Sequence, residues 1–306
     1  MNRRFHTVAV LMGGSSSERD ISMLSGTAVA GALREAGYRV FAVEVDAQDA
    51  FALPPEVEAV FIALHGTFGE DGGVQKVLRR LGVPYTGSDA ASSRISFDKL
   101  LAREAFQAGG VRVPDGAVVR SDAIAGAAPP WLPVVVKPPC QGSSVGVSIV
   151  KDAAAFPAAL AEAAKYGETI LLEAYIPGRE WTVPIVGEQV LPIVEITPKI
   201  GDGWYDWTAK YQSGGTTVYT FPEDDPANAA IAREVRAQAL AAFKSVRARG
   251  VARVDFRISP EGVPYALELN SIPGCTANSI LPKSAAKAGI AFPALCERIL
   301  ESAQCI

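Results

Sequence analysis

The chain has 306 residues, of which 49% are hydrophobic and 20% charged, and its formal net charge is −4. A chain of this length is expected to divide into two or three compact units, each with its own core. A protein with a net negative charge has no long-range positive potential of the kind that attracts nucleic acid or an anionic membrane, so we expect neither partner. No apolar stretch has the length of a bilayer span. Four scattered cysteines without a CxxC spacing favour a reducing, cytoplasmic location.

The first third of the chain alternates between strand and helix patterns. Short β-branched runs predict strands, and longer amphipathic runs predict helices. The apolar run near the N-terminus is shorter than the core of a signal peptide and lacks a cleavage pattern, so we interpret it as the first strand. Alternation of strands and helices is typical of a parallel sheet with helices on its faces, and the first unit is expected to end near Ser88. Strands are expected at 6–14, 38–46, 59–66 and 83–88, and helices at 18–37 and 73–82.

The remainder predicts mixed strands and helices. A long helix is expected at 226–249, and two strands, 251–258 and 263–270, are joined by the turn SPEG. The long connection 199–222 is typical of an active-site lid. The other strands are expected at 111–119, 131–138, 168–176 and 181–196, and the other helices at 92–110 and 152–165.

The stretch KPPCQGSSVGVS, residues 137–148, follows a buried apolar strand and begins with a lysine at the strand end. Backbone N–H groups that suit a phosphate-binding loop are offered by Gly142, Ser143, Ser144 and Gly146. The spacing is not that of a Walker A loop. Because glycine and serine are also common in solvated turns, this stretch alone leaves a phosphate loop and an ordinary loop open.

The hairpin 251–270 gathers polar residues on one face. Simple alternation places Arg253 and Asp255 on one strand and Glu268 and Asn270 on the other, with Arg253 across from Glu268. The opposite, apolar face is expected to carry Val254, Phe256, Ile258, Val263, Tyr265, Leu267 and Leu269. Hard oxygen ligands beside a guanidinium suit Mg²⁺ bound together with phosphate. A solvated face with one cross-strand ion pair gives the same pattern, but the polar segment NSIPGCTANS that follows is typical of a substrate loop.

Two further loops follow strands in the first unit. GGSSSERDIS opens a helix whose positive end suits an anion, and Glu18 within it suits an ammonium group. The G-x-G-x-x-G spacing of dinucleotide-binding proteins is absent. ALHGTFGEDGGVQ places His65 and Glu70 in another loop, where His65 is equally compatible with a turn residue that packs its ring.

Together and in this order, these residues resemble the D-alanine–D-alanine ligase family of the ATP-grasp superfamily. The matching segments span nearly the whole chain: GGSSSERDISMLSG, ALHGTFGEDGGVQ, PYTGS, the DK of FDKLL, VVVKPPCQGSSVGVS, LLEAYIPGREWTV, YDWTAKY, RVDF and ELNSIPGCTANSILP. The resemblance implies α/β and α+β units in an ATP-grasp fold. It implies an N-terminal parallel-sheet domain at 1–95, a central subdomain with the phosphate flap at 96–182, and a C-terminal subdomain with the lid, metal site and second-substrate loop at 183–306.

The resemblance also implies how ATP and its metal are held. Two lysines contact the phosphates, the glycine-serine loop closes over them, a hinge binds adenine and an acid binds ribose. The implied ATP-binding residues are Lys99, Lys137, Ser143, Ser144, Glu173, Ala174, Tyr175, Ile176, Glu180 and Lys210, and the implied Mg²⁺ ligands are Asp255, Glu268 and Asn270. Mn²⁺ as an alternative metal and activation by K⁺ are left open.

The implied reaction joins two D-alanines for peptidoglycan synthesis. ATP phosphorylates the first D-alanine to an acyl phosphate, and the amine of the second attacks it. The implied catalytic residues are Glu18, Ser143, Lys210, Tyr211, Arg253 and Gly274, and the implied substrate-binding residues are Glu18, His65, Tyr211, Asn270, Ser279 and Ile280. Arg253 and the N–H of Gly274 are expected to stabilise the oxyanion. Tyr211 favours an amine nucleophile over D-lactate, unless it serves only as a lid anchor.

Several positions depart from the family pattern. Cys140 and Gln141 stand in the flap where polar or acidic residues are expected, Cys275 replaces methionine, and Ile280 replaces leucine. Cys140 and Cys275 are open to two interpretations, an oxidant-sensitive pair near ATP or small buried hydrophobes, of which we favour the second.

Other functions stay open at this stage. They are a different ATP-grasp carboxylate–amine ligase, a nucleotide-binding regulatory protein without turnover, and a dinucleotide-dependent oxidoreductase, which the missing glycine fingerprint disfavours. The family resemblance implies a homodimer formed through the first domain.

Overall fold

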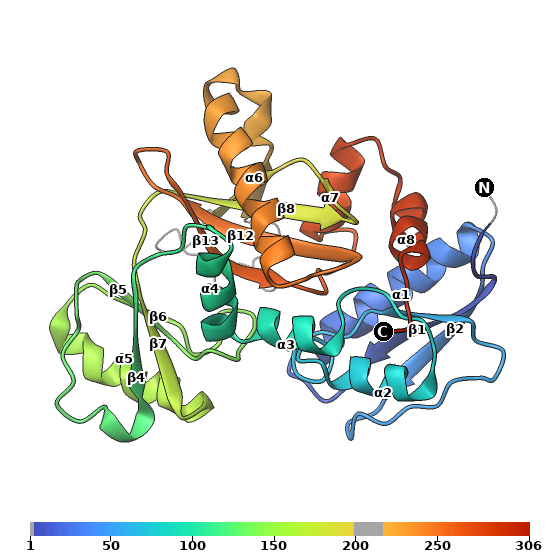
Figure 1. The fold of residues 1–306 in the computed structure, drawn as a ribbon, viewed down its shortest axis with the longest axis horizontal. Coiled ribbons are helices and arrows are strands. Elements are labelled where there is room, and N and C mark those ends of the chain that lie inside the picture. The colour runs from blue at the N-terminus through green and yellow to red at the C-terminus, as the bar shows by residue number, and fades with distance from the viewer. Residues whose placement is uncertain (1–2, 199–216) are drawn as a thin grey trace.

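The computed structural model describes residues 3–198 and 217–306, which form three β-sheets with helices packed on their faces (Figure 1). The first sheet is parallel, with strand order β2-β1-β3, as the alternating pattern predicts. Its elements are β1 (Thr7–Gly13), α1 (Arg19–Glu35), β2 (Arg39–Val45), β3 (Ala59–Ile62) and α2 (Gly73–Leu81). The expected strand at 83–88 shrinks to a single parallel bridge between Tyr85 and Val60.

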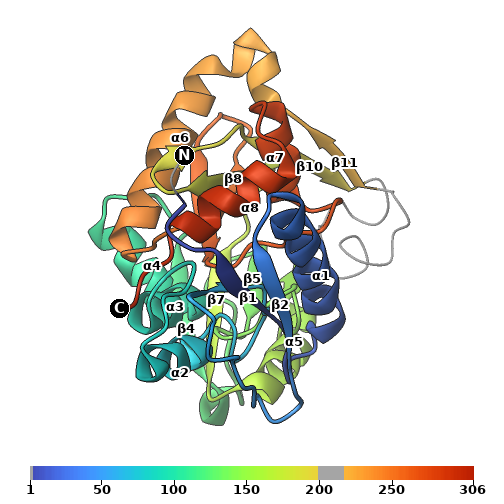
Figure 2. The ribbon, with the colours of Figure 1, turned by 90° about the vertical axis from the view of Figure 1, so that its right-hand side faces the viewer.

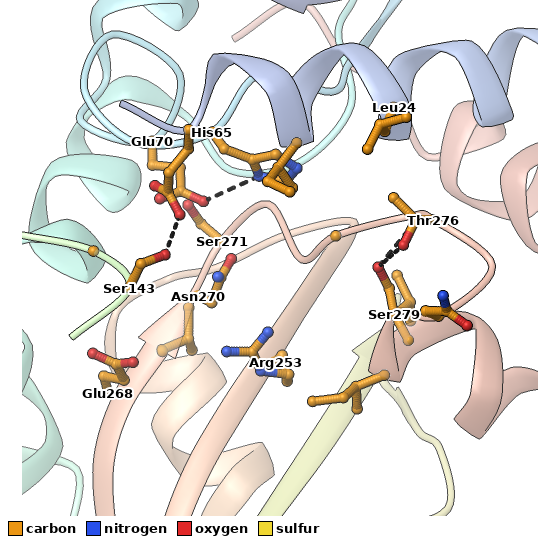
Figure 3. A pocket seen from close by; sticks show the side chains of 18 of the residues that line it. Leu24, His65, Glu70, Ser143, Arg253, Glu268, Asn270, Ser271, Thr276 and Ser279 are labelled. Atoms are coloured by element: carbon orange, nitrogen blue, oxygen red, sulfur yellow. Dashed lines mark hydrogen bonds and ion pairs between the residues drawn. The ribbon is translucent and has the colours of Figure 1, made fainter. Parts of the chain in front are cut away.

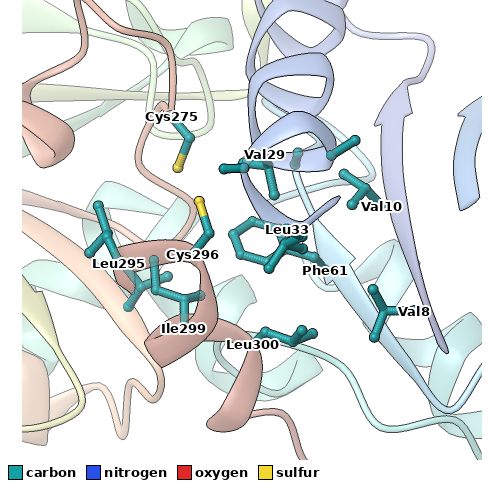
Figure 4. Close-up of a cluster of buried hydrophobic side chains, with 14 of the residues drawn as sticks. Val8, Val10, Val29, Leu33, Phe61, Cys275, Leu295, Cys296, Ile299 and Leu300 are labelled. Atoms are coloured by element: carbon teal, nitrogen blue, oxygen red, sulfur yellow. The ribbon is translucent and has the colours of Figure 1, made fainter. Parts of the chain in front are cut away.

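Both faces of the first sheet are buried, which is the usual condition of parallel strands. On one face Ala9 and Leu11 of β1 pack with α2. The other face packs against α1 and also against α8 (Phe292–Glu301), the last helix of the chain. Figure 2 shows α8 beside α1, and Figure 4 shows the shared core formed by Val8, Val10, Val29, Leu33, Phe61, Leu295, Ile299 and Leu300. The C-terminal helix therefore completes the core of the N-terminal unit.

A second, antiparallel sheet has strand order β4-β7-β5-β6, and α5 covers one of its faces. Its core contains Val134 and Val136 of β5 together with Phe156 and Leu160 of α5. The elements are β4 (Gly116–Arg120), β5 (Val134–Lys137), β6 (Ser148–Val150), α5 (Phe156–Ala163) and β7 (Thr169–Ala174). Because β5 ends at Lys137 and β6 begins at Ser148, the glycine-serine loop is the connection of an antiparallel pair.

The third sheet is also antiparallel and has the order β11-β10-β8-β12-β13, with β9 paired to β8. Helices α4 and α6 cover one face through Phe106 and Phe243, which pack against Trp181 and Phe256. The elements are α4 (Lys99–Ala108), β8 (Arg179–Val186), β9 (Gln189–Val190), β10 (Val194–Pro198), β11 (Thr217–Thr220), α6 (Ala229–Ser245), β12 (Val251–Ile258), β13 (Pro264–Asn270) and α7 (Ile280–Lys287). Short 3₁₀ turns occupy Ser121–Ala123, Ala153–Ala155, Ala164–Tyr166, Pro222–Asp224 and Pro226–Asn228.

The predicted register of the β12–β13 hairpin is wrong. Asp255 pairs with Glu268, and Arg253 pairs with Asn270 rather than with Glu268. The register shifts between Asp255 and Phe256, so Phe256 faces Ala266 and not Tyr265. An extra residue in one strand reverses the alternation beyond it, and simple alternation along the whole hairpin cannot anticipate this. The shift keeps the two carboxylates opposite each other.

The single helix expected at 92–110 is two helices, α3 (Ala90–Phe97) and α4. Asp98 has an extended backbone between them, and its carboxylate accepts hydrogen bonds from the N–H groups of Leu100 and Leu101. An aspartate in this role starts a new helix. The break places Lys99 at the first position of α4.

Within the described residues, none of the helices combines the length and the apolar character that crossing a bilayer requires.

Candidate active site

A cavity of about 900 Å³ lies where the N-terminal loops, the glycine-serine loop and the third sheet meet. Figure 3 shows His65 and Glu70 on one side of it, Ser143 reaching in from the flap, and Glu268, Asn270 and Arg253 rising from the sheet. The predicted site residues that line it are Glu18, His65, Lys99, Ser143, Arg253, Glu268, Asn270, Gly274, Ser279 and Ile280. Residues from all parts of the chain thus meet in one place. Lys210 and Tyr211 lie outside the described residues, as does most of the expected lid.

The glycine-serine loop, residues 138–147, is docked on the N-terminal unit. The hydroxyl of Ser143 donates a hydrogen bond to the Glu18 carboxylate (Figure 3). Glu18 caps the start of α1 but makes no hydrogen bond to the helix with its side chain, which leaves the carboxylate directed to the loop. Ser143 and Ser144 both have positive φ, 51° and 62°. Such backbone conformations in non-glycine residues are concentrated at functional sites.

Gly142 also contacts Glu18. A Cβ atom at this position would lie 3.0 Å from Oε2 of Glu18. That separation is tighter than most contacts of a Cβ atom, so a larger residue here would displace the end of the Glu18 side chain by a few tenths of an ångström.

A chain of polar contacts connects the two predicted substrate loops. Nδ1 of His65 lies 3.7 Å from Oε1 of Glu70, and Nε2 lies 3.3 Å from the hydroxyl of Ser25 on α1. The same hydroxyl accepts the N–H of Cys275 at 3.4 Å. Burial raises the pKa of Glu70, although His65 beside it acts in the opposite direction. His65 is therefore buried and belongs to a network of polar contacts, and its role in substrate binding stays a prediction.

The polar end of the hairpin carries the predicted metal ligands. Arg253 donates two hydrogen bonds to Asp255, at 2.8 and 2.7 Å, and Thr182 donates a third at 2.5 Å. On the neighbouring strand Glu268 pairs with Lys99 at 3.1 Å. Burial alone would lower the pKa of Lys99, but the carboxylate of Glu268 outweighs it and the pKa is raised.

The donor atoms of this set fit Mg²⁺. Asp255 and Glu268 are cross-strand partners, and Asn270 lies two residues from Glu268 along β13. Two carboxylates and an amide present the oxygen ligands that Mg²⁺ prefers. Within the described residues, no group of three or more histidine, cysteine, aspartate or glutamate side chains is placed to hold a metal ion. The predicted set contains only two such side chains, so it stays a prediction.

Lys137, at the root of the flap, is buried and forms an ion pair with Glu173 at 2.5 Å. Arg103 of α4 approaches the other oxygen of Glu173 at 3.5 Å. A carboxylate between two cations is held in place from both sides. Lys137, Ser144 and Glu173 do not line the 900 Å³ cavity, so the predicted phosphate and adenine positions extend beyond it.

The predicted adenine hinge, residues 173–176, spans the end of β7 and the two residues after it. Arg257 of β12 donates to the carbonyl oxygens of Ile176 at 3.2 Å and Gly178 at 2.8 Å. It also approaches Glu180, the predicted ribose ligand, at 3.5 Å. Ala174 and Tyr175 donate their N–H groups to the backbone carbonyls of residues 115 and 133. The hinge and the ribose acid are thus positioned by one buried arginine that the sequence did not single out.

The second-substrate loop ends at α7. Ser279 precedes the helix, and its hydroxyl accepts the N–H of Thr276 at 3.1 Å and lies 2.8 Å from the Thr276 hydroxyl (Figure 3). A Cβ atom on Gly274 would lie 2.9 Å from the same hydroxyl, so Gly274 is closely packed against Ser279. Ile280 is buried and belongs to a small cluster with Val194 and Ile196.

Several lining residues were missed by sequence reasoning. Ser271 is buried, and its hydroxyl has no hydrogen-bond partner in the described structure. Leu24 of α1 is 60% exposed at the wall opposite Thr276 (Figure 3). The other missed residues include Ile21, Ser96, Phe97, Tyr219, Asn278 and Lys283. Amphipathic periodicity locates such positions on a helix or strand, but it gives no signal that they face a cavity.

The cysteines correct one expectation. Cys140 is exposed, which contradicts its interpretation as a small buried residue. Cys275 is buried as expected, and its neighbour in the core is Cys296 of α8, as Figure 4 shows. Burial raises the pKa of Cys275 to about 12, so its thiol is unreactive at neutral pH. The structure gives no support to a sensitive pair of Cys140 and Cys275.

The two antiparallel sheets, one of which carries the flap at the edge of a lysine-lined cavity, define an ATP-grasp enzyme. Comparisons with known proteins are more specific. Residues 49–88 match the model "D-ala D-ala ligase N-terminus", and residues 125–301 match "D-ala D-ala ligase C-terminus". The chain belongs to the D-alanine–D-alanine ligase family.

Relatives and solved structures agree with this assignment. A D-alanine–D-alanine ligase of Anaeromyxobacter sp. (strain Fw109-5) is 45% identical, over 97% of this chain and 96% of the relative. One from Acidiphilium cryptum is 44% identical, over 97% and 98%. The structure of a ligase from Bacillus anthracis complexed with ATP matches with a TM-score of 0.80 and 31% identity, covering 99% of this chain and 97% of that one. A ligase from Coxiella burnetii matches with a TM-score of 0.83 and 25% identity, over 97% and 93%.

Proposed function

We propose that this protein joins two D-alanines to D-alanyl-D-alanine and converts ATP to ADP and phosphate. The observation that carries the proposal is the convergence at one cavity of the carboxylate predicted to bind an amine, the loop predicted to bind phosphate, and an arginine–carboxylate cluster. The carboxylate is that of Glu18, and Ser143 anchors the loop to it. The cluster contains Arg253 and Asp255.

The first step must convert one carboxylate oxygen of the first D-alanine into a good leaving group. Free carboxylate resists attack by an amine, whereas an acyl phosphate does not. Asp255, Glu268 and Asn270 would hold Mg²⁺, which when bound supplies charge neutralisation for phosphoryl transfer. Nζ of Lys99 donates to the carbonyl oxygen of Gln141 at 2.7 Å and pairs with Glu268, and so ties the flap to the sheet. Its charge would face the phosphates.

The second step develops negative charge on the carbonyl oxygen under attack. Arg253 and the N–H of Gly274 both face the cavity and are the donors that we assign to this oxyanion. Glu18 would hold the ammonium group of the first D-alanine, with His65 nearby. Ser279 and Ile280 would seat the carboxylate of the second. Lys210 and Tyr211, which lie outside the described residues, keep their predicted roles in phosphoryl transfer and in the choice of nucleophile.

Further assignments rest on the family alone. They are the peptidoglycan role of the product, a cytoplasmic location, a homodimer, and the domain limits at 95/96 and 182/183. A different carboxylate–amine ligase is the alternative, and Glu18 and the Ser279 loop favour D-alanine over it.

The direct test measures ADP and phosphate release from ATP and Mg²⁺ with D-alanine, with L-alanine and with no amino acid, and identifies the product by mass. We expect release that depends on D-alanine, with formation of a dipeptide. The variant Arg253→Met is expected to lose at least a hundredfold in rate, because it removes an oxyanion donor. If the wild type binds ATP but forms no dipeptide, the substrate assignment fails while the fold assignment stands.

A further inference from the structure

Lys283 lines the cavity from the first turn of α7, although no sequence motif marks it. Its Nζ atom donates to the carbonyl oxygen of Asn278 at 2.7 Å and approaches that of Ala277 at 3.5 Å. It also lies 5.2 Å from the centre of the Tyr219 ring. The ammonium group is therefore held beside the second-substrate loop by neutral acceptors.

Within the described residues, Lys283 forms no ion pair, which sets it apart from Lys99 beside Glu268. Burial lowers the pKa of Lys283, because a partly desolvated ammonium group lacks a compensating charge. A cation in the first turn of a helix also opposes the helix dipole. Both costs disappear if an anion lies between Lys283 and the start of α7.

The geometry indicates which anion this is. Lys283 follows Ser279 by four residues, so the two side chains lie on the same face of the helix start. An ammonium group has three N–H donors, and the two carbonyl contacts leave one for a ligand. The anion site is thus bounded by the Ser279 hydroxyl, the first N–H groups of α7 and the Lys283 ammonium.

We propose that Lys283 binds the carboxylate of the amino acid that supplies the attacking amine, and that it selects for a negatively charged second substrate. This inference rests on the proposed function and extends it to a residue outside the predicted set. The competing explanation is that Lys283 only fixes the loop through Ala277 and Asn278.

The test compares D-alanine with D-alaninamide as the second substrate. D-alaninamide has an attacking amine but no carboxylate to phosphorylate, so it serves only in the second position, and its product is D-alanyl-D-alaninamide. A fixed mixture of the two compounds is incubated with ATP and Mg²⁺, and the ratio of dipeptide to dipeptide amide is measured by mass spectrometry. This ratio does not depend on how much of a variant is folded.

Lys283→Met is expected to shift the product ratio toward the amide by about tenfold, the range for loss of one charge-assisted contact. Lys283→Arg keeps the charge and is expected to shift it less than threefold. The matched control is Lys287→Met, one turn further along α7, where the lysine pairs with Asp224 at 2.7 Å and does not line the cavity. We expect no shift for this variant.

A Lys283→Met ratio within twofold of the wild type would overturn the role of Lys283, since the carboxylate would then be recognised without its charge. An equal shift in Lys287→Met would overturn it as well. The absence of any dipeptide from the wild type would instead overturn the proposed function.

Discussion

Replacement of Ser25 by alanine tests whether the contact between the substrate loops matters. The Ser25 side chain is buried, and its hydroxyl is shared by the His65 ring at 3.3 Å and the Cys275 N–H at 3.4 Å. Alanine removes both contacts and leaves a buried N–H group without an acceptor. Ser271→Ala is a matched control, because its hydroxyl is equally buried but has no partner in the described structure.

The magnitude follows from the geometry. Both contacts of Ser25 are long, so each is expected to contribute at the lower end of the usual range, and an unsatisfied buried N–H costs about 1–3 kcal/mol. We therefore expect Ser25→Ala to lower the free energy of unfolding by about 2 kcal/mol. For a chain of this size, that corresponds to a fall in Tm of about 3–6 °C. Ser271→Ala is expected to shift Tm by less than about 1 °C, because no hydrogen bond is lost.

The assay is thermal denaturation of both variants, followed by steady-state kinetics on each. Because Cys275 follows Gly274, a released loop is expected to misplace the predicted oxyanion donor and to lower kcat by about tenfold in Ser25→Ala, while ATP binding stays unchanged. Equal Tm values and equal kcat for the two variants would refute the reasoning. Recovery of Tm and kcat by Ser25→Thr, which restores a hydroxyl, would support it.

Three further predictions concern the flap, the hinge and the exposed thiol. Ser143→Ala removes the hydrogen bond to Glu18. We expect kcat/KM to fall at least tenfold, which corresponds to the loss of one charge-assisted hydrogen bond. An unchanged kcat/KM would show that docking of the flap is not needed. The lysine of Arg257→Lys cannot reproduce the two contacts to the hinge carbonyls, so KM for ATP is expected to rise about tenfold at saturating D-alanine. A rise in KM for D-alanine instead would contradict the role of Arg257 in positioning the adenine hinge. Although the Cys140 side chain is exposed, partial desolvation of its sulfur and the nearby Asp98 raise its pKa to about 11. Alkylation by iodoacetamide, followed by mass spectrometry, is therefore expected to be slow at pH 7 and to accelerate as the pH rises to that value. Rapid labelling of Cys140 at pH 7 would refute the raised pKa.

The sequence alone determined the local features of the site. Gly142 and the two serines after it predict a loop that binds phosphate, and this stays a prediction; the structure shows the loop docked on Glu18 through the Ser143 hydroxyl. Alternation along the hairpin placed Asp255 and Glu268 on one face, but it paired Glu268 with Arg253, and the structure pairs Glu268 with Asp255 instead. Such features depend on backbone conformation and on neighbours close in sequence, which short patterns specify.

Only the tertiary structure decided how these parts meet. The bulge after Asp255 set which residues face each other across the hairpin, and α8 completed a core that β1 and α1 begin. Ser25, Arg257 and Lys283 gained their partners from segments far along the chain or from a loop whose shape no motif specifies. Burial and electrostatic pairing depend on the packed neighbours of a side chain, and these neighbours exist only once the sheets and helices have come together.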